Sequence, residues 1–185
     1  MVSPAFFGEN KMENKIEKYF FGLDLSLNST GISVFTTDDM RFVETSTIAI
    51  DKKNPALRET KSKLSYIGTE FKKYEKTYKP EFIVMEQGFM RYIKSTAQLM
   101  KVFGMTYFIF HAIDQYEVPA TSIKKVLTGM GNADKEQVAQ AVLRYYPGMN
   151  FTSTDESDAC AVGIYWGLKQ GWLKEINNGE NHVPK

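Results

Sequence analysis

Four acidic residues lie where a predicted strand ends or a predicted helix begins, and they are the candidates for chemistry in this chain. Asp24 follows the apolar run FFGL, and burying a charge without a partner is costly, so its carboxylate needs a partner. Glu86 closes a second apolar run, FIVM. Asp155 and Asp158 are three residues apart, which on a helix places both on one face with Cβ atoms about 5 to 6 Å apart. Such carboxylates repel one another unless something positive sits among them.

The ligand types in this group favour a hard divalent cation. Carboxylate oxygens are the ligands that Mg²⁺ and Mn²⁺ prefer, whereas the single cysteine, Cys160, excludes a multi-cysteine zinc site. Two such ions about 4 Å apart can activate a water and stabilise the leaving oxygen of a phosphodiester. Simpler interpretations stay open: Glu86 as an exposed strand-end carboxylate, and the aspartate pair as acids that offset a helix dipole.

Length and composition restrict the class of protein. The 185 residues, 43% of them hydrophobic, suffice for one ordinary core and are too few for two large lobes. The formal net charge is +1, so any basic surface must be local. One cysteine cannot form an intramolecular disulfide, and we find no secretion signal or apolar run long enough to span a bilayer. We therefore expect a cytoplasmic protein without a membrane partner.

The first two acids require a sheet that brings distant strands together. Residues 19–35 predict a hairpin of two strands around a polar turn, with Asp24 near its open end. The segment Glu81–Gln87 predicts a short strand that a helical crossover would place parallel to an earlier one. Since active sites of open α/β sheets gather at the carboxyl ends of the strands, we expect Glu86 to approach Asp24.

The remaining segments predict the rest of the sheet and the helices that cover it. Together they indicate an α/β fold with a mixed five-stranded sheet flanked by helices. The segment Ser95–Tyr116 is so apolar that it should be a central helix or part of a subunit interface. We expect a strand at Arg41–Ile50, helices at Ala56–Lys79 and Ser95–Tyr116, an extended segment at Val118–Ser122, helices beginning at Ile123 and Asp134, and a helix over Thr154–Lys174 with Thr154 as its N-cap.

The same patterns predict the domain limits. Residues 1–17 are polar and lack periodicity, so we expect a flexible leader there. Residues 18–176 form one domain, because no repeat, low-complexity tract or linker interrupts them. Residues 177–185 form a polar tail.

Four motifs resemble those of the RuvC-type Holliday junction resolvases, a family of ribonuclease H-like nucleases. They occur in the family's order and with similar spacing over about residues 19–167. The chain departs from the family pattern in its leader, across residues 38–55, and by one residue before Lys124. The motifs are GLDLSLNSTG with Asp24, VMEQGFM with Glu86 and Phe89, IKKVLTGMGNADK with Lys124 and Lys135, and DESDACAVG with Asp155 and Asp158.

The resemblance implies a ribonuclease H-like fold and a Mg²⁺-dependent homodimer that nicks four-way junctions, and other branched DNA, near the nucleoid or viral DNA. The four acids would be metal ligands and catalytic residues, with Lys135 as a further catalytic residue near the scissile backbone. Phe89 would stack on bases at the branch point; a core position is the simpler alternative for it, as a structural ion pair is for Lys135. The predicted DNA-binding residues are Phe89, Arg91, Lys94, Lys124 and Lys125, where either of the last two lysines could be the one that approaches DNA.

Three other functions fit parts of the sequence. The GLDLSLNSTG hairpin also resembles the phosphate-binding hairpin of actin-like ATPases and sugar kinases, but that fold needs two lobes, which 185 residues cannot supply. A nuclease-fold protein that binds junctions without cutting them is disfavoured, because all four acids are present. A third function keeps the chemistry and changes the substrate to other branched DNA or to RNA, since fold and metal site do not determine substrate.

Overall fold

A mixed sheet organises the part of the chain that the computed structural model describes, residues 16–88 and 93–176. The strand order is β3-β2-β1-β4-β5, with β1 antiparallel to β2 and parallel to β4. The predicted mixed five-stranded α/β sheet is therefore confirmed. The strands are β1 (Tyr19–Asp24), β2 (Ser29–Thr36), β3 (Phe42–Ala49), β4 (Phe82–Glu86) and β5 (Asp114–Val118).

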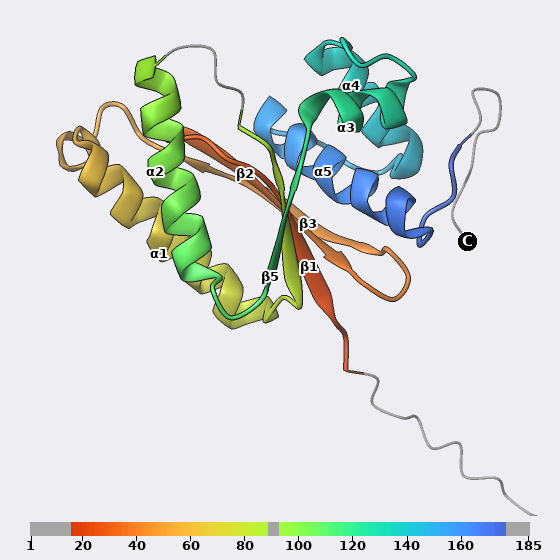
Figure 1. Ribbon diagram of the computed structural model, residues 1–185, viewed down its shortest axis with the longest axis horizontal. Helices are drawn as coiled ribbons and strands as arrows, with labels where there is room; N and C mark the ends of the chain where they lie inside the picture. Colours follow the sequence, from red (N-terminus) through yellow and green to blue (C-terminus); the bar gives the residue numbers. More distant parts are fainter. Residues whose placement is uncertain (1–15, 89–92, 177–185) are drawn as a thin grey trace, which may run out of the picture.

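Helices cover both faces of this sheet (Figure 1). On one side α1 and α2 pack against each other, and on the other side α5 lies on β1 and β2 and is itself covered by α3 and α4. The α5 helix thus runs between the central strands and an outer helical layer. The helices are α1 (Thr60–Tyr78), α2 (Ile93–Ile109), α3 (Ala120–Thr128), α4 (Lys135–Tyr145) and α5 (Thr154–Gln170), with a short 3₁₀ helix at Pro55–Leu57.

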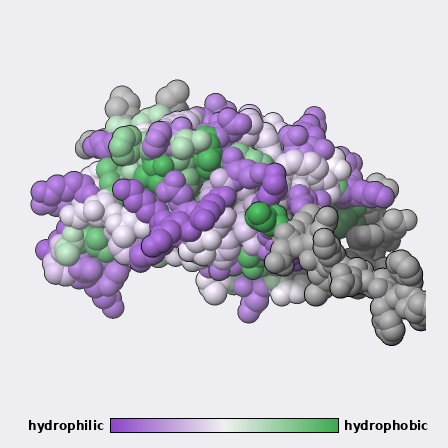
Figure 2. Space-filling model, turned by 90° about the horizontal axis from the view of Figure 1, so that it is seen from below, coloured by the Kyte–Doolittle hydropathy of each residue, from purple (hydrophilic) through white to green (hydrophobic). Residues whose placement is uncertain are grey.

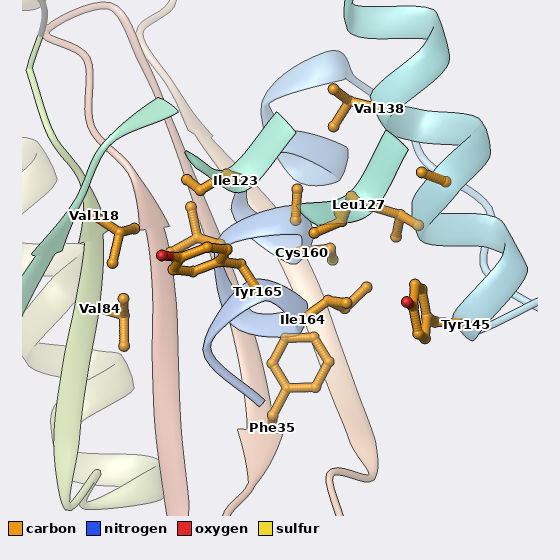
Figure 3. Packing of buried hydrophobic residues seen from close by; sticks show 14 of the residues in the cluster. Phe35, Val84, Val118, Ile123, Leu127, Val138, Tyr145, Cys160, Ile164 and Tyr165 are labelled. Atoms are coloured by element: carbon orange, nitrogen blue, oxygen red, sulfur yellow. The ribbon is translucent and has the colours of Figure 1, made fainter. Parts of the chain in front are cut away.

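Two hydrophobic clusters, one on each face of the sheet, hold these layers together. Successive strand residues point to opposite faces, so Phe20 enters the cluster beneath α5 while Phe21 enters the cluster beneath α1 and α2. Figure 3 shows the first cluster, where Val84 and Val118 of the sheet face Tyr165 of α5. A strand that is buried on both faces has a continuous run of apolar residues, which is why β1 and β4 could be predicted from the sequence.

Two glycines allow α5 to approach the sheet closely. A Cβ atom at Gly22 would lie 2.6 Å from the Ala159 carbonyl oxygen, and one at Gly31 would lie 2.0 Å from the Asp155 carbonyl oxygen. Any side chain there would push the helix away. Ser33 of β2 adds a hydrogen bond of 2.8 Å to the Ala159 carbonyl oxygen. The first turn of α5 is thereby held against β2.

The segment after residue 94 differs from its prediction. One helix was predicted over Ser95–Tyr116 and an extended segment at Val118–Ser122, but α2 ends at Ile109 and the last strand lies at residues 114–118. This strand is at the sheet edge and pairs in parallel with β4. Its side chains are mostly exposed, so no alternation of apolar residues marks it in the sequence. This strand is stabilised by its hydrogen-bonded pairing with β4, which the local sequence does not reveal. The α3 helix begins at Ala120, inside the segment predicted to be extended.

Two helix starts also differ by a few residues. The helix predicted from Ala56 begins at Thr60, and a separate 3₁₀ turn at Pro55–Leu57 precedes it, where proline suits the first helical position. The N-cap of α5 is Ser153, whose hydroxyl accepts a hydrogen bond of 3.3 Å from the Glu156 amide, and Thr154 is the first helical residue. Serine and threonine are both common N-caps, so only the backbone conformation distinguishes these neighbours.

The predicted ends of the domain fall at the limits of the described residues. The predicted leader, residues 1–17, lies outside them except for its last two residues, and the tail at 177–185 lies entirely outside. The domain limits therefore stay a prediction. Among the described helices, none is long and apolar enough to cross a membrane.

Candidate active site

Two of the predicted acids end neighbouring strands. The parallel strands β1 and β4 pair Leu23 with Met85, and Asp24 and Glu86 follow one residue further along each strand. Because neighbouring strands lie about 4.8 Å apart, the two carboxylates lie side by side at the carboxyl ends of these strands. In Figure 1 this is the upper edge, from which β4 leads toward α2.

The other two acids reach this edge on α5. Across the β1–β2 ladder Asp24 is paired with Gly31, which lies against the backbone of Asp155. Asp158 follows one turn later on the same helix. The structure therefore brings together the four acids that the sequence analysis singled out.

Burial and mutual repulsion dominate the electrostatics of these acids. The pKa of Asp24 is raised from 3.8 to about 7, first by burial of the carboxyl group and then by the negative charges of the other acids, Glu86 foremost. Burial also raises the pKa of Glu86, and the charge of Asp158 adds to this effect. Since the shifts of both groups are caused by loss of solvent and by like charges, the site has an excess of negative charge.

Lys135 offsets part of this excess. It begins α4, and its Nζ lies 2.9 Å from Oδ2 of Asp158 and 3.4 Å from the Thr154 hydroxyl. This ion pair is the structural arrangement that the simpler interpretation of Lys135 describes. The lysine side chain is nevertheless 58% exposed, against 15% for Asp158. Its ammonium group therefore remains accessible from solvent at the rim of the site.

The two lysines of α3 have different surroundings. The positive charge of Lys124 offsets part of the rise in the pKa of Glu86, so Lys124 lies within electrostatic reach of this acid. Lys125 is exposed and lines a surface pocket with Tyr165 and Lys169. Of the two lysines that the sequence left as alternatives, Lys124 is the one whose charge reaches the candidate site.

The remaining predicted DNA-binding residues follow β4. Phe89 and Arg91 lie outside the described residues. Lys94 belongs to the first turn of α2, one residue before the helix predicted from Ser95, and its side chain is outside the described part. The roles of these three residues stay predictions.

Two residues near Asp155 were missed by the sequence analysis. The Ser29 hydroxyl donates a hydrogen bond to Oδ2 of Asp155, although Ser29 was treated only as a turn residue. Glu156, which was not among the candidate residues, is buried and accepts hydrogen bonds from the Thr152 amide at 2.7 Å and the Thr152 hydroxyl at 2.6 Å. No local signal marks Ser29, because its partner lies 126 residues away.

The donor set fits a hard divalent cation. All four groups are carboxylates, and the raised pKa values of Asp24 and Glu86 show a concentration of negative charge that a cation would relieve. As the side chains lie, no group of three or more His, Cys, Asp or Glu among the described residues is close enough to hold a metal ion. A bound ion would have to draw the carboxylates inward and compete with Lys135 for Asp158.

This combination of sheet, covering helix and acids is that of a ribonuclease H-like nuclease. The family model described as crossover junction endodeoxyribonuclease RuvC matches residues 20–166 of the chain. The chain belongs to the RuvC family, whose members are divalent-metal endonucleases that resolve crossover junctions. The resemblance in the sequence motifs and the predicted fold are thereby confirmed.

Individual relatives agree with this assignment. The crossover junction endodeoxyribonuclease RuvC of Rickettsia bellii (strain OSU 85-389) is 27% identical over 152 residues, which cover 76% of this chain and 91% of the relative. The structure of T. thermophilus RuvC in complex with a Holliday junction substrate has a TM-score of 0.70 at 18% identity, covering 83% of this chain and 94% of that one. The yeast mitochondrial Holliday junction resolvase Ydc2 has a TM-score of 0.59 at 16% identity, covering 84% and 81%. At such identities the two structures show a shared fold.

The raised pKa of Asp24 predicts that the metal-free protein loses stability as the pH rises. A carboxyl group with a pKa near 3.8 when unfolded and about 7 when folded binds more protons in the folded state between these values, so the free energy of unfolding falls across that range. We expect the loss to be on the order of 2 to 4 kcal/mol. Because asparagine cannot ionise, Asp24→Asn should melt at a higher temperature than the wild type at pH 8 in EDTA, and at nearly the same temperature at pH 4.

The matched control is Asp114→Asn, which changes an exposed aspartate on β5. Its melting temperature should follow that of the wild type at both pH values. If Asp24→Asn melts below the wild type at pH 8, the charged carboxylate stabilises the fold and the predicted sign is wrong.

Proposed function

We propose that this chain resolves four-way DNA junctions by metal-dependent phosphodiester hydrolysis, with Asp24, Glu86, Asp155 and Asp158 as metal ligands. The observation that supports the proposal is the placement of these acids at the same end of the sheet, near enough for their charges to raise the pKa of Asp24, on a fold whose family cuts crossover junctions. All-oxygen ligands favour Mg²⁺, for which Mn²⁺ can substitute.

The protein's own contribution to this chemistry is to hold charge in place. Two divalent ions bound by such acids would activate a water and stabilise the leaving oxygen. Two of the acids are on strands of a buried sheet, and two are on a helix seated against it, so the backbone that carries them is rigid. Lys135 presents an ammonium group at the rim, where it can neutralise a phosphate of the backbone being cut.

Loss of one carboxylate should abolish cleavage and spare binding. Asp24→Asn keeps the size of the side chain and removes its charge, so we expect cutting of a synthetic four-way junction in Mg²⁺ to fall at least about 100-fold. Junction affinity, measured in EDTA by gel shift, should be unchanged or higher, because fewer negative charges face the phosphates. Asp114→Asn is again the control. Near-normal cutting by Asp24→Asn would contradict the assignment of the site.

The same assay discriminates among substrates. The structure of T. thermophilus RuvC in complex with a Holliday junction substrate supports four-way junctions as the substrate proposed for this chain. Wild-type protein should cut an immobile four-way junction faster than a replication fork, a linear duplex or an RNA hybrid. Faster cutting of the fork or the hybrid would assign the chain to another branched or RNA-containing substrate. A DNA substrate would place the protein in the cytoplasm, with the nucleoid or viral DNA.

Lys135, Lys124, Lys94, Arg91 and Phe89 are proposed to contact the DNA, and Lys135 allows a direct test. A lysine that neutralises one phosphate lowers the slope of log affinity against log salt by about one when it is removed. We expect this change, together with slower cutting, for Lys135→Ala. The exposed Lys174→Ala, beyond the far end of α5, should retain the wild-type slope. If Lys135→Ala changes neither slope nor cutting rate, the ion pair with Asp158 is its whole role.

A homodimer is the proposed working unit, with α2 at its interface. A four-way junction offers two equivalent strands to cut, and a twofold dimer presents two equivalent sites. Exposed apolar side chains on α2 include Met100, Tyr107 and Phe108, the last 75% exposed. Figure 2 shows hydrophobic side chains gathered on the side of the molecule that carries α1 and α2. Patches of this kind mark protein contacts.

Phe108→Asp tests this interface. A charge at the most exposed of these residues should oppose association, so light scattering at micromolar concentration should give the mass of one chain, against two for the wild type. Met130→Asp, at another exposed apolar residue in the α3–α4 loop, should keep the wild-type mass. A monomeric wild type that still resolves junctions would contradict the proposed dimer.

A further inference from the structure

We propose that Ser29 is a positioning residue that orients the Asp155 carboxylate for metal binding. This inference rests on the proposed function, because it takes Asp155 to be a metal ligand. The Ser29 hydroxyl donates a hydrogen bond to Oδ2 of Asp155. Ser29 begins β2 and Asp155 lies in the first turn of α5, so this bond joins the sheet to a side chain of the candidate site.

The backbone explains why residue 29 can reach this carboxylate. Ser29 and Gly31 are two residues apart on β2, so both point to the same face of the sheet. At Gly31 that face meets the backbone of Asp155, since a Cβ there would lie 2.0 Å from its carbonyl oxygen. Ser29 therefore points toward the start of α5, and Gly31 provides the close approach that its short side chain needs.

The hydrogen bond restricts a side chain that otherwise has several options. An aspartate in the first turn of a helix can rotate toward solvent, toward the helix amides or toward Asp24, whose pKa already responds to the charge of Asp155. The Ser29 hydroxyl selects one of these orientations. A carboxylate has about four acceptor positions, so accepting one hydrogen bond leaves others for a cation. Hydrogen bonds that orient a ligand in this way typically change metal affinity 10- to 100-fold.

The placement of α5 does not depend on Ser29. The Ser33 hydroxyl donates to the Ala159 carbonyl oxygen at 2.8 Å, one turn further along the helix. The Thr47 and Ser153 hydroxyls are also hydrogen-bonded to each other, which ties β3 to the residue that caps α5. Removing the Ser29 hydroxyl should therefore release the carboxylate and leave the helix in place.

The experiment compares Ser29→Ala with Ser33→Ala. Both remove a serine hydroxyl of β2 that bonds to α5, but only Ser29 contacts a carboxylate. The first readout is the rise in melting temperature with Mg²⁺ in the absence of DNA, and the second is the Mg²⁺ concentration for half-maximal junction cutting. Ser29→Thr keeps the hydroxyl and serves as the conservative variant.

For Ser29→Ala we expect a roughly tenfold increase in the half-maximal Mg²⁺ concentration in both readouts, with cutting restored at saturating Mg²⁺. Its melting temperature in EDTA should stay close to that of the wild type. Ser29→Thr should match the wild type in both readouts. Ser33→Ala should melt at a lower temperature in EDTA, because it removes a buried hydrogen bond between β2 and α5, and should keep the wild-type Mg²⁺ dependence.

Two outcomes would overturn the inference alone. In the first, Ser29→Ala has the wild-type Mg²⁺ dependence in both readouts while Asp24→Asn has lost cutting, so the metal site stands and Ser29 has no part in it. In the second, Ser29→Ala and Ser33→Ala shift the Mg²⁺ dependence equally, so the bond merely ties strand to helix. If Mg²⁺ neither stabilises the wild type nor supports cutting, the proposed function itself fails and the inference fails with it.

Discussion

The carboxyl group of Asp24 is largely removed from solvent and lies within the electrostatic reach of three other acids, and the repulsion among these charges is the constraint on which the rest of the site depends. A chain does not gather such groups at no cost, since each loses solvent and each disfavours the ionised form of the others. The raised pKa values of Asp24 and Glu86 are the direct consequence. Lys135 relieves part of the excess at Asp158, and a divalent cation would relieve more.

The apolar architecture makes this arrangement sustainable. The strands β1 and β4 are buried on both faces, so the positions where they end are determined by the two hydrophobic clusters rather than by the acids themselves. Two glycines then allow α5 to lie directly on the sheet, which sets the distance of its first turn from Asp24. The packing therefore brings the backbone positions of the acids to one end of the sheet despite the repulsion among their charges.

In addition to this packing, polar side chains and backbone amides form hydrogen bonds to single carboxylates near the site. The RuvC family explains the fold and the chemistry, and structures that share the fold are only 16 to 18% identical to the chain. In this chain those contacts are the hydrogen bonds of Ser29 with Asp155 and of Thr152 with Glu156. The first restricts the orientation of a carboxylate, and the second ties a carboxylate to the backbone just before α5.

The amino-acid sequence by itself determined the features that depend on short stretches of the chain. The buried strands were predictable because burial on both faces leaves apolar runs, and the acids were conspicuous because they interrupt or end those runs. Only the tertiary structure decided the features that depend on partners far along the chain. The edge strand β5 forms through its pairing with β4, the charge of Lys124 acts on Glu86 because of how α3 packs against α5, and Ser29 meets Asp155, which lies 126 residues further along the chain. Local patterns reflect burial, whereas contacts between distant side chains depend on how helices and strands are packed, which no short stretch of sequence records.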